Sequence, residues 1–157
     1  MNWLSRTLAG VGRRLPGPGP NHRDRITVVG LLVSERDRLE LQQIASRAQW
    51  SLKLCATVED ALRSLPANEP ALIICDREIA GPDWQNTIQT LASSAPGSCV
   101  ILASRVNDEY LWHEVIGHGG YDVITIPFAE ETTVHMVQLA WSYWKVTKSR
   151  PYAPRKE

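Results

Sequence analysis

The feature that most constrains this chain is a regular alternation of short apolar runs and longer amphipathic stretches between residues 26 and 146. The apolar runs are rich in β-branched residues, which is typical of strands buried on both faces. The longer stretches repeat apolar residues every three or four positions, which predicts helices with one buried side. Strands that alternate with helices pair in parallel through right-handed crossovers, so the pattern predicts an α/β fold with helices on both faces of one sheet.

Five strands and five helices are expected in this region. The predicted strands are residues 26–33, 52–56, 71–75, 100–103 and 123–126. The predicted helices are residues 38–50, a helix opened by Thr57, a helix carrying the stripe 84–92, and residues 108–116 and 130–146. Thr57 has Asp60 three residues later, which is an acidic variant of the capping box and indicates a helix start.

The two ends of the chain differ from its middle in charge. Residues 1–25 carry a net charge of +4 and include the proline- and glycine-rich linker 15–20, and residues 148–157 carry +3. The middle carries −7, although the whole chain is neutral. A chain of 157 residues suits one domain, which we expect to span residues 26–147 between a disordered N-terminal segment and a basic tail.

The N-terminal segment leaves a second reading open. Leu4, Leu8 and Val11 would share one side of a helix with arginines opposite, so membrane or partner contact by residues 1–15 is an alternative to disorder. No apolar run approaches the roughly 18 residues of a membrane helix, and no signal-peptide pattern is present. The three cysteines lie inside apolar runs without metal-site spacing. These features favour reduced, buried thiols in a cytoplasmic protein.

Folds of this kind bind ligands at the carboxyl ends of the strands, near the point where the strand order reverses. Candidate site residues therefore follow the predicted strands. They are Ser34, Glu35, residues 76–81, Ser104, Arg105 and residues 126–128.

Three of these segments resemble the receiver domain of bacterial response regulators, the CheY-like family, in the right order and spacing. IICDREIAGPD resembles the strand, phosphoacceptor aspartate and following loop of that family, with Asp76 at the phosphoacceptor position. VILAS resembles the fourth strand that ends in a switch hydroxyl, here Ser104, and GHGGYDVITIPF resembles the fifth strand with its terminal Pro-Phe. The resemblance implies a (βα)5 flavodoxin-like sandwich with strand order 2-1-3-4-5. It also implies a cis bond between Ile126 and Pro127.

The departures from the family concern the chemistry. Receivers carry two adjacent acids after the first strand, where this chain has Ser34 and Glu35, and a lysine before Pro-Phe, where it has Ile126. The resemblance implies a weakened Mg²⁺ site made of Glu35, Asp76 and the backbone carbonyl of Glu78. We therefore expect Asp76 to sit as a lone acid in a shallow anionic pocket that lacks its ammonium group.

Arg105 stands where receivers have a small residue after the switch hydroxyl. Its guanidinium suits either a phosphoryl group or a permanent ion pair with Asp76, and a solvent-facing loop arginine is the alternative. Phosphoryl transfer to a carboxylate needs positioned cations, so loss of the lysine favours a receiver that works without phosphorylation.

The leading hypothesis is a stand-alone, non-enzymatic receiver-like protein that acts in signal transduction, including phosphorelay, by protein–protein contact. Its partner would be a histidine kinase, a phosphotransfer protein or another receiver. The alternatives are a phospho-accepting regulator with weak Mg²⁺ binding and a flavodoxin-like ligand-binding module. The acids after the first strand, Glu35 and Asp37, disfavour phosphate binding by such a module.

Self-association is also predicted. By family resemblance, the last two helices and the fifth strand can form a homodimer, with Trp112 and Tyr143 as candidate contacts. The tail of the chain is too short for a DNA-binding domain.

Overall fold

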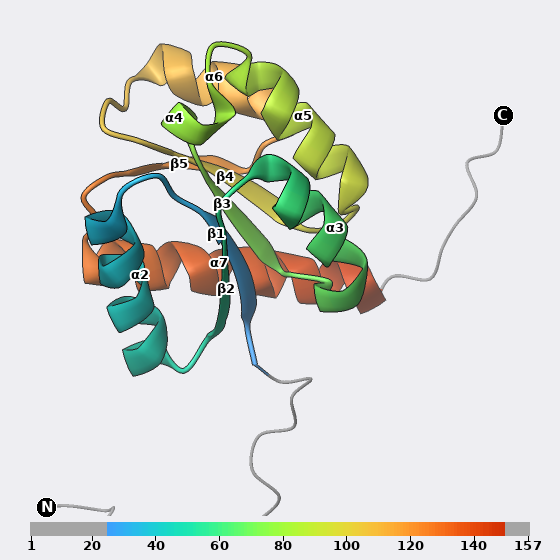
Figure 1. The fold of residues 1–157 in the computed structure, drawn as a ribbon. Coiled ribbons are helices and arrows are strands. Elements are labelled where there is room, and N and C mark those ends of the chain that lie inside the picture. The colour runs from blue at the N-terminus through green and yellow to red at the C-terminus, as the bar shows by residue number, and fades with distance from the viewer. Residues whose placement is uncertain (1–24, 150–157) are drawn as a thin grey trace, which may run out of the picture.

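Five parallel strands form one sheet in the order β2-β1-β3-β4-β5 (Figure 1), in a computed structural model that describes residues 25–149. The strands are β1 (Thr27–Leu31), β2 (Ser51–Cys55), β3 (Leu72–Asp76), β4 (Cys99–Ser104) and β5 (Asp122–Thr125). The predicted strand order and parallel pairing are confirmed. The order reverses between β1 and β3, so the candidate site lies at the carboxyl ends of these strands.

Six helices lie within the described residues. They are α2 (Glu35–Ala48), α3 (Val58–Asn68), α4 (Arg77–Ala80), α5 (Trp84–Ser94), α6 (Glu109–Gly117) and α7 (Glu130–Ser149). The single turn of α4 was not predicted. The first helix begins three residues before the predicted start at Arg38, because Ser34 is its N-cap and the buried Asp37 extends its inner side.

The two faces of the sheet are covered by different helices (Figure 1). One core lies between the sheet and helices α2 and α7, and includes Leu41, Ile101 and Val137. The other lies between the sheet and helices α3, α5 and α6, and includes Ile73 and Ile88. Side chains alternate between the faces of a strand, so the continuous apolar runs of β3 and β4 supply both cores.

Two local features confirm details of the sequence reading, and a third was not predicted. The backbone N–H of Asp60 donates to Thr57 Oγ1 at 3.1 Å, which caps α3. The Ile126–Pro127 bond is cis. Gly120 precedes β5 where a Cβ would lie 2.9 Å from the carbonyl oxygen of Val115, so the chain passes closer to α6 than a larger residue allows.

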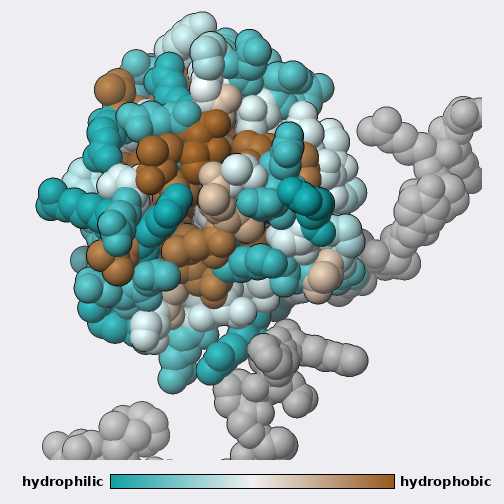
Figure 2. Space-filling view, in the orientation of Figure 1, coloured by the Kyte–Doolittle hydropathy of each residue, from teal (hydrophilic) through white to brown (hydrophobic). Residues whose placement is uncertain are grey.

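The edge strand β2 carries an apolar area on its outer side (Figure 2). Val33 and Leu39 are exposed there, beside Leu54 in a shallow depression. Lys53 is the exposed residue of the strand itself. A lysine on an edge strand discourages pairing with another sheet.

Some predictions fall outside the described residues. The predicted disorder and membrane contact of the N-terminal segment concern residues 1–24, and most of the predicted basic tail is residues 150–157. None of the helices within residues 25–149 is long and apolar enough to span a membrane. All three cysteines are buried and free.

Candidate functional site

Asp76 is the last residue of β3 and lies at the carboxyl edge of the sheet, beside Ala103 of β4. Only 4% of its surface is exposed. Its Oδ1 accepts the backbone N–H of Glu78 at 2.9 Å, and its Oδ2 accepts that of Val33 at 3.3 Å. We expected Asp76 in a shallow anionic pocket. Instead the carboxylate is enclosed, caps α4 and ties the β1–α2 loop to β3.

The charge of Asp76 also acts on its neighbour in β3. Burial, and to a smaller extent the Asp76 carboxylate, raises the pKa of the Cys75 thiol to about 12. A thiol with so high a pKa stays protonated at neutral pH and is a poor nucleophile. Cys75 therefore behaves as an apolar core residue.

The residues that approach Asp76 from the first strand are apolar. Leu31 pairs with Cys75 across the sheet, so Leu32 and Val33 follow β1 at the level of Asp76. Ser34 is the N-cap of α2 and Glu35 is its first residue. Glu35 lines a depression with Leu39 and Leu54 on the β2 side, and Asp76 is not among the residues of that depression.

Arg105 follows β4 and has a carboxylate partner, but that partner is Asp37. Its Nη2 lies 3.0 Å from Asp37 Oδ2, with the Asp37 side chain 3% exposed and the Arg105 side chain 55% exposed. Of the readings left open for Arg105, the ion pair with Asp76 does not form in this structure, because the buried carboxylate of Asp37 takes the guanidinium. Asp37 was not predicted as the partner of Arg105, although it lies four residues before Leu41 on the inner side of α2.

The ends of β4 and β5 complete the surroundings. Ser104 is buried at the end of β4, opposite Thr125, and its Oγ accepts the backbone N–H of Val106 at 3.2 Å. Ile126 is 3% exposed and packs in the apolar core that includes Phe128. The residue at the position of the family lysine is therefore part of the core.

Comparisons with solved structures identify the fold. The signal receiver domain of an HD domain-containing protein from Pseudomonas fluorescens Pf-5 matches 81% of this chain and 94% of its own, at 20% identity and a TM-score of 0.72. A response regulator from Thermotoga maritima matches 75% of this chain and 98% of its own, at 19% identity and a TM-score of 0.68. The fold is that of a response-regulator receiver domain.

A third receiver structure, the beryllofluoride-activated NtrC4 receiver domain dimer, matches 75% of this chain and 98% of its own, at 19% identity and a TM-score of 0.68. No protein-family model and no curated protein sequence matches the chain significantly. The similarity therefore establishes the receiver fold, and the chemistry must be judged from the residues of this chain.

A magnesium ion fits the surroundings of Asp76 poorly. Within residues 25–149, no group of three or more His, Cys, Asp or Glu side chains is arranged to hold a metal. Mg²⁺ requires several oxygen ligands in octahedral geometry. The set predicted for Mg²⁺ contains only two carboxylates, and each oxygen of Asp76 already shares its lone pairs with a backbone N–H.

The surface predicted for self-association is exposed in this chain. Trp112 of α6 is 41% exposed and Tyr143 of α7 is 56% exposed. Trp112 packs edge-on against His113, and the rings of Tyr143 and Tyr121 lie 5.8 Å apart. Tyr121 immediately precedes β5, so these aromatic residues lie around the predicted surface of α6, β5 and α7.

Proposed function

We propose that this chain is a receiver-fold signalling protein that acts by binding other proteins and does not depend on phosphorylation of Asp76. The proposal assigns the chain no catalysed reaction. It rests on one observation above the others: Asp76 is enclosed, and each of its carboxylate oxygens already accepts a backbone N–H.

The state of the Asp76 carboxylate supports the proposal directly. An aspartate that accepts a phosphoryl group must present an oxygen to the donor with its path of attack open. At 4% exposure, and with each oxygen accepting one backbone N–H, Asp76 offers a donor only the remaining lone pairs of an enclosed carboxylate. A phosphoryl donor would therefore have to reach a buried oxygen.

The arrangement of nearby cations supports it further. The negative charge that develops during phosphoryl transfer needs cations held in position. Ile126 supplies none, Arg105 is paired with Asp37, and the Arg77 guanidinium lies 5.6 Å from the ring centre of Trp84. We infer that any Mg²⁺ that binds at Asp76 binds weakly.

Binding to a partner would use the surface around α6, β5 and α7. Aromatic residues that are exposed on a soluble protein are common anchors of protein interfaces. Trp112 and Tyr143 have this character here. The proposed partner is a histidine kinase, a phosphotransfer protein or a receiver, and a second copy of this chain is the simplest case to test.

Acetyl phosphate, a small phosphoryl donor, tests the phosphorylation-independent function. The full chain is incubated with acetyl phosphate and Mg²⁺ and its intact mass is measured, with a receiver that has a complete acidic and lysine site treated in parallel. We expect the control receiver to gain about 80 Da, the mass of one phosphoryl group, and this chain to stay unmodified.

The opposite result has a clear meaning. Stoichiometric addition of one phosphoryl group, lost in Asp76→Asn and kept in Asp83→Asn, would make the chain a phospho-accepting regulator and overturn the proposal. Asp83 is a suitable control because it is an exposed aspartate at the start of α5 whose side chain makes no cap hydrogen bond.

Sedimentation velocity of the full chain tests the binding surface. We expect concentration-dependent dimerisation that Trp112→Ala and Tyr143→Ala each weaken about tenfold or more, as is usual for aromatic anchors. Leu39→Ala, on the outer side of α2, is the control because it removes an equally exposed apolar side chain elsewhere. A dimer insensitive to the first two substitutions would contradict this choice of surface.

A further inference from the structure

The outer edge of β2 carries main-chain groups that no strand of the described part of the chain pairs with. β2 lies at the edge of the sheet, and its neighbour is β1. The N–H of Ser51 donates to the carbonyl oxygen of Ile26, just before β1, at 2.9 Å. Successive residues of a strand turn their N–H and C=O groups to opposite sides, so Lys53 also faces β1, whereas Leu52 and Leu54 face outward.

Two depressions flank this edge, one on each face of the sheet. On the α2 side, Leu54 lies with the exposed Val33 and Leu39 in a depression of about 430 Å³, within the apolar area of Figure 2. On the α3 side, Lys53 and Arg63 line a second depression of about 440 Å³. Side chains of an added strand would point alternately to the two faces, so both depressions would receive them.

The two depressions differ in charge. On the α3 side, Asp60 Oδ1 already accepts Arg63 Nη2 at 3.0 Å. Lys53 is exposed in the same depression and has no carboxylate partner among residues that the structure describes. On the α2 side, Glu35 and Arg38 balance each other around an apolar centre. An added strand should therefore carry an acidic side chain toward α3 and apolar side chains toward α2.

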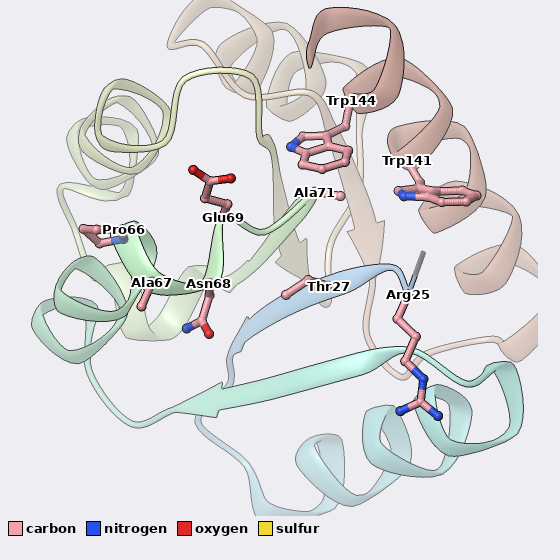
Figure 3. Close-up of a pocket in the computed structure, with 9 residues that line it drawn as sticks. All are labelled: Arg25, Thr27, Pro66, Ala67, Asn68, Glu69, Ala71, Trp141 and Trp144. Atoms are coloured by element: carbon pink, nitrogen blue, oxygen red, sulfur yellow. The ribbon is translucent and has the colours of Figure 1, made fainter. Parts of the chain in front are cut away.

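The pocket at the amino edge of the sheet is different, because its aromatic wall is already covered. This pocket of about 550 Å³ lies between the end of α3 and the indoles of Trp141 and Trp144 on α7 (Figure 3). The ammonium group of Lys145 lies 3.8 Å from the ring centre of Trp141, and that of Lys148 lies 5.6 Å from the ring centre of Trp144. Cations are favourable partners of indole faces, so side chains of α7 itself cover these rings.

We propose that the outer edge of β2 binds an extended segment of a partner protein, in antiparallel pairing and with the pattern apolar–acidic–apolar. Leu52 and Leu54 would each exchange both of their outward hydrogen bonds with this segment. The acidic residue would lie opposite Lys53 on the α3 side. The two apolar residues would enter the α2 side, against Val33 and Leu39.

A second copy of this chain suits the same edge less well. When two β2 strands pair antiparallel over their whole length, Lys53 of one copy lies opposite Lys53 of the other, and like charges directly opposite each other are destabilising. The lysine therefore disfavours pairing of β2 with itself and favours an acidic strand. Because β5 lies at the other edge of the sheet, this inference goes beyond the surface of α6, β5 and α7 and is independent of Asp76.

A labelled peptide tests the charge preference of the edge. A fluorescein-labelled peptide with the core Thr-Val-Glu-Val-Thr is titrated with the full chain, and its fluorescence anisotropy is followed. We expect saturable binding that weakens about fivefold or more when lysine replaces the glutamate of the peptide. Proline in place of the second valine should abolish binding, because it removes an N–H that the edge requires. Absence of saturable binding up to about 1 mM protein would refute the proposal.

Reversal of the charge on the protein tests the contact at Lys53. Lys53→Glu should weaken binding of the glutamate peptide about fivefold or more, and it should bind the lysine peptide more tightly than wild type does. Lys145→Glu on α7 is the matched control, since Lys145 lines neither depression, and it should leave both affinities unchanged. If Lys53→Glu bound the glutamate peptide as tightly as wild type does, the proposed pairing would be wrong.

Amide hydrogen exchange with the glutamate peptide bound tests the position of the added strand. The N–H groups of Leu52 and Leu54 should exchange about tenfold more slowly, whereas that of Lys53, which already faces β1, should change little. Slower exchange on α2 alone, with Leu52 and Leu54 unchanged, would place the peptide on the helix and contradict strand pairing.

Sedimentation velocity with saturating glutamate peptide separates a partner segment from a second copy as the occupant. We expect the peptide to leave the oligomeric state of the full chain unchanged, because any dimer through α6, β5 and α7 uses the other edge of the sheet. If the peptide dissociated a dimer of the chain, the outer edge of β2 would be an interface between copies and the proposal would be wrong.

Discussion

Two aspartates are buried near the carboxyl edge of the sheet, and the chain holds them in different ways. Asp37, in the first turn of α2, is paired with a guanidinium, whereas Asp76, at the end of β3, accepts two backbone N–H groups. Asp76 therefore accepts hydrogen bonds only from neutral backbone groups, and the nearby Arg105 pairs with Asp37 instead. The comparison suggests that Asp76 has a structural role here.

Loss of the Asp76 side chain should cause the largest change. Asp76→Ala leaves the N–H groups of Val33 and Glu78 without their acceptor and removes the cap of α4, so we expect the free energy of unfolding to fall by about 3 kcal/mol. Asp76→Asn keeps one oxygen acceptor and should cost about 1 kcal/mol. Urea denaturation measures both.

Asp83→Ala is the control, with an expected change within about 0.5 kcal/mol, because this exposed side chain makes no cap hydrogen bond. If Asp76→Ala were as mild as the control, the two backbone hydrogen bonds would contribute little and the structural role of Asp76 would be refuted.

Breaking the pair on the other aspartate should have a somewhat smaller effect. Arg105→Met leaves the carboxylate of Asp37 buried without its cation, and we expect a loss of about 2 kcal/mol, because the half-exposed arginine position lets water approach. Asp37→Asn should cost less, since Arg105 is then free to turn to solvent. Thermal or urea unfolding of the two variants gives the values.

The double variant of Arg105→Met and Asp37→Asn sharpens this result. It should lose less than the two single variants together, by about 1 kcal/mol or more, because the second substitution removes the unpaired charge. Additive losses would mean that the 3.0 Å contact contributes no coupling.

Alkaline pH should reveal the surroundings of Asp76 through Cys75. The folded-state pKa of about 12 lies above the ordinary value of 9.0, so folding favours the protonated thiol. The resulting stabilisation is complete below pH 9 and is lost as the pH rises toward 12, by about 1.4 kcal/mol at pH 10. Urea unfolding of wild type and Cys75→Ala between pH 8 and 10.5 gives the slope of the free energy of unfolding against pH for each chain.

The free energy of unfolding of Cys75→Ala should fall less steeply with rising pH than that of wild type, whatever the stability of the variant at pH 8. Asp76→Asn should flatten the decline slightly, because the carboxylate is the smaller of the two causes of the raised pKa. Parallel curves for wild type and Cys75→Ala would show that folding does not raise the pKa of the Cys75 thiol.

The contrast between Asp37 and Asp76 also shows which features of the fold and the site could be predicted from the sequence. The alternation of apolar runs and amphipathic stretches was sufficient for the parallel α/β fold, whereas the strand order and the cis bond at Pro127 came from the resemblance to receivers. The prediction placed Ser34 and Glu35 at the acidic positions, but the turn after β1 puts Leu32 and Val33 at the level of Asp76. Spacing alone does not show where a strand stops and a turn begins.

The partner of Arg105 and the pocket at the amino edge depend on tertiary structure. Arg105 and Asp37 are 68 residues apart, and only the packing of α2 beside the β4–α6 loop brings them together. Trp141 and Trp144 continue the inward stripe of Val134 and Val137, which predicts ordinary core packing. They line a pocket because α3 ends at Asn68 and leaves space beside α7.

The smallest expected effect separates the two aspartates by their response to salt. The Arg105 side chain is 55% exposed, so salt should screen its attraction to Asp37, whereas the hydrogen bonds of Asp76 to backbone amides lie inside the protein. Between 0.1 and 1 M NaCl, we expect the coupling energy of Arg105 and Asp37 to fall by about 0.5 kcal/mol. The cost of Asp76→Ala should stay constant within error. A salt-insensitive Arg105–Asp37 pair together with a salt-sensitive Asp76 would reverse the comparison, because it would mean that Asp76 is the carboxylate whose stability depends on a cation near the surface.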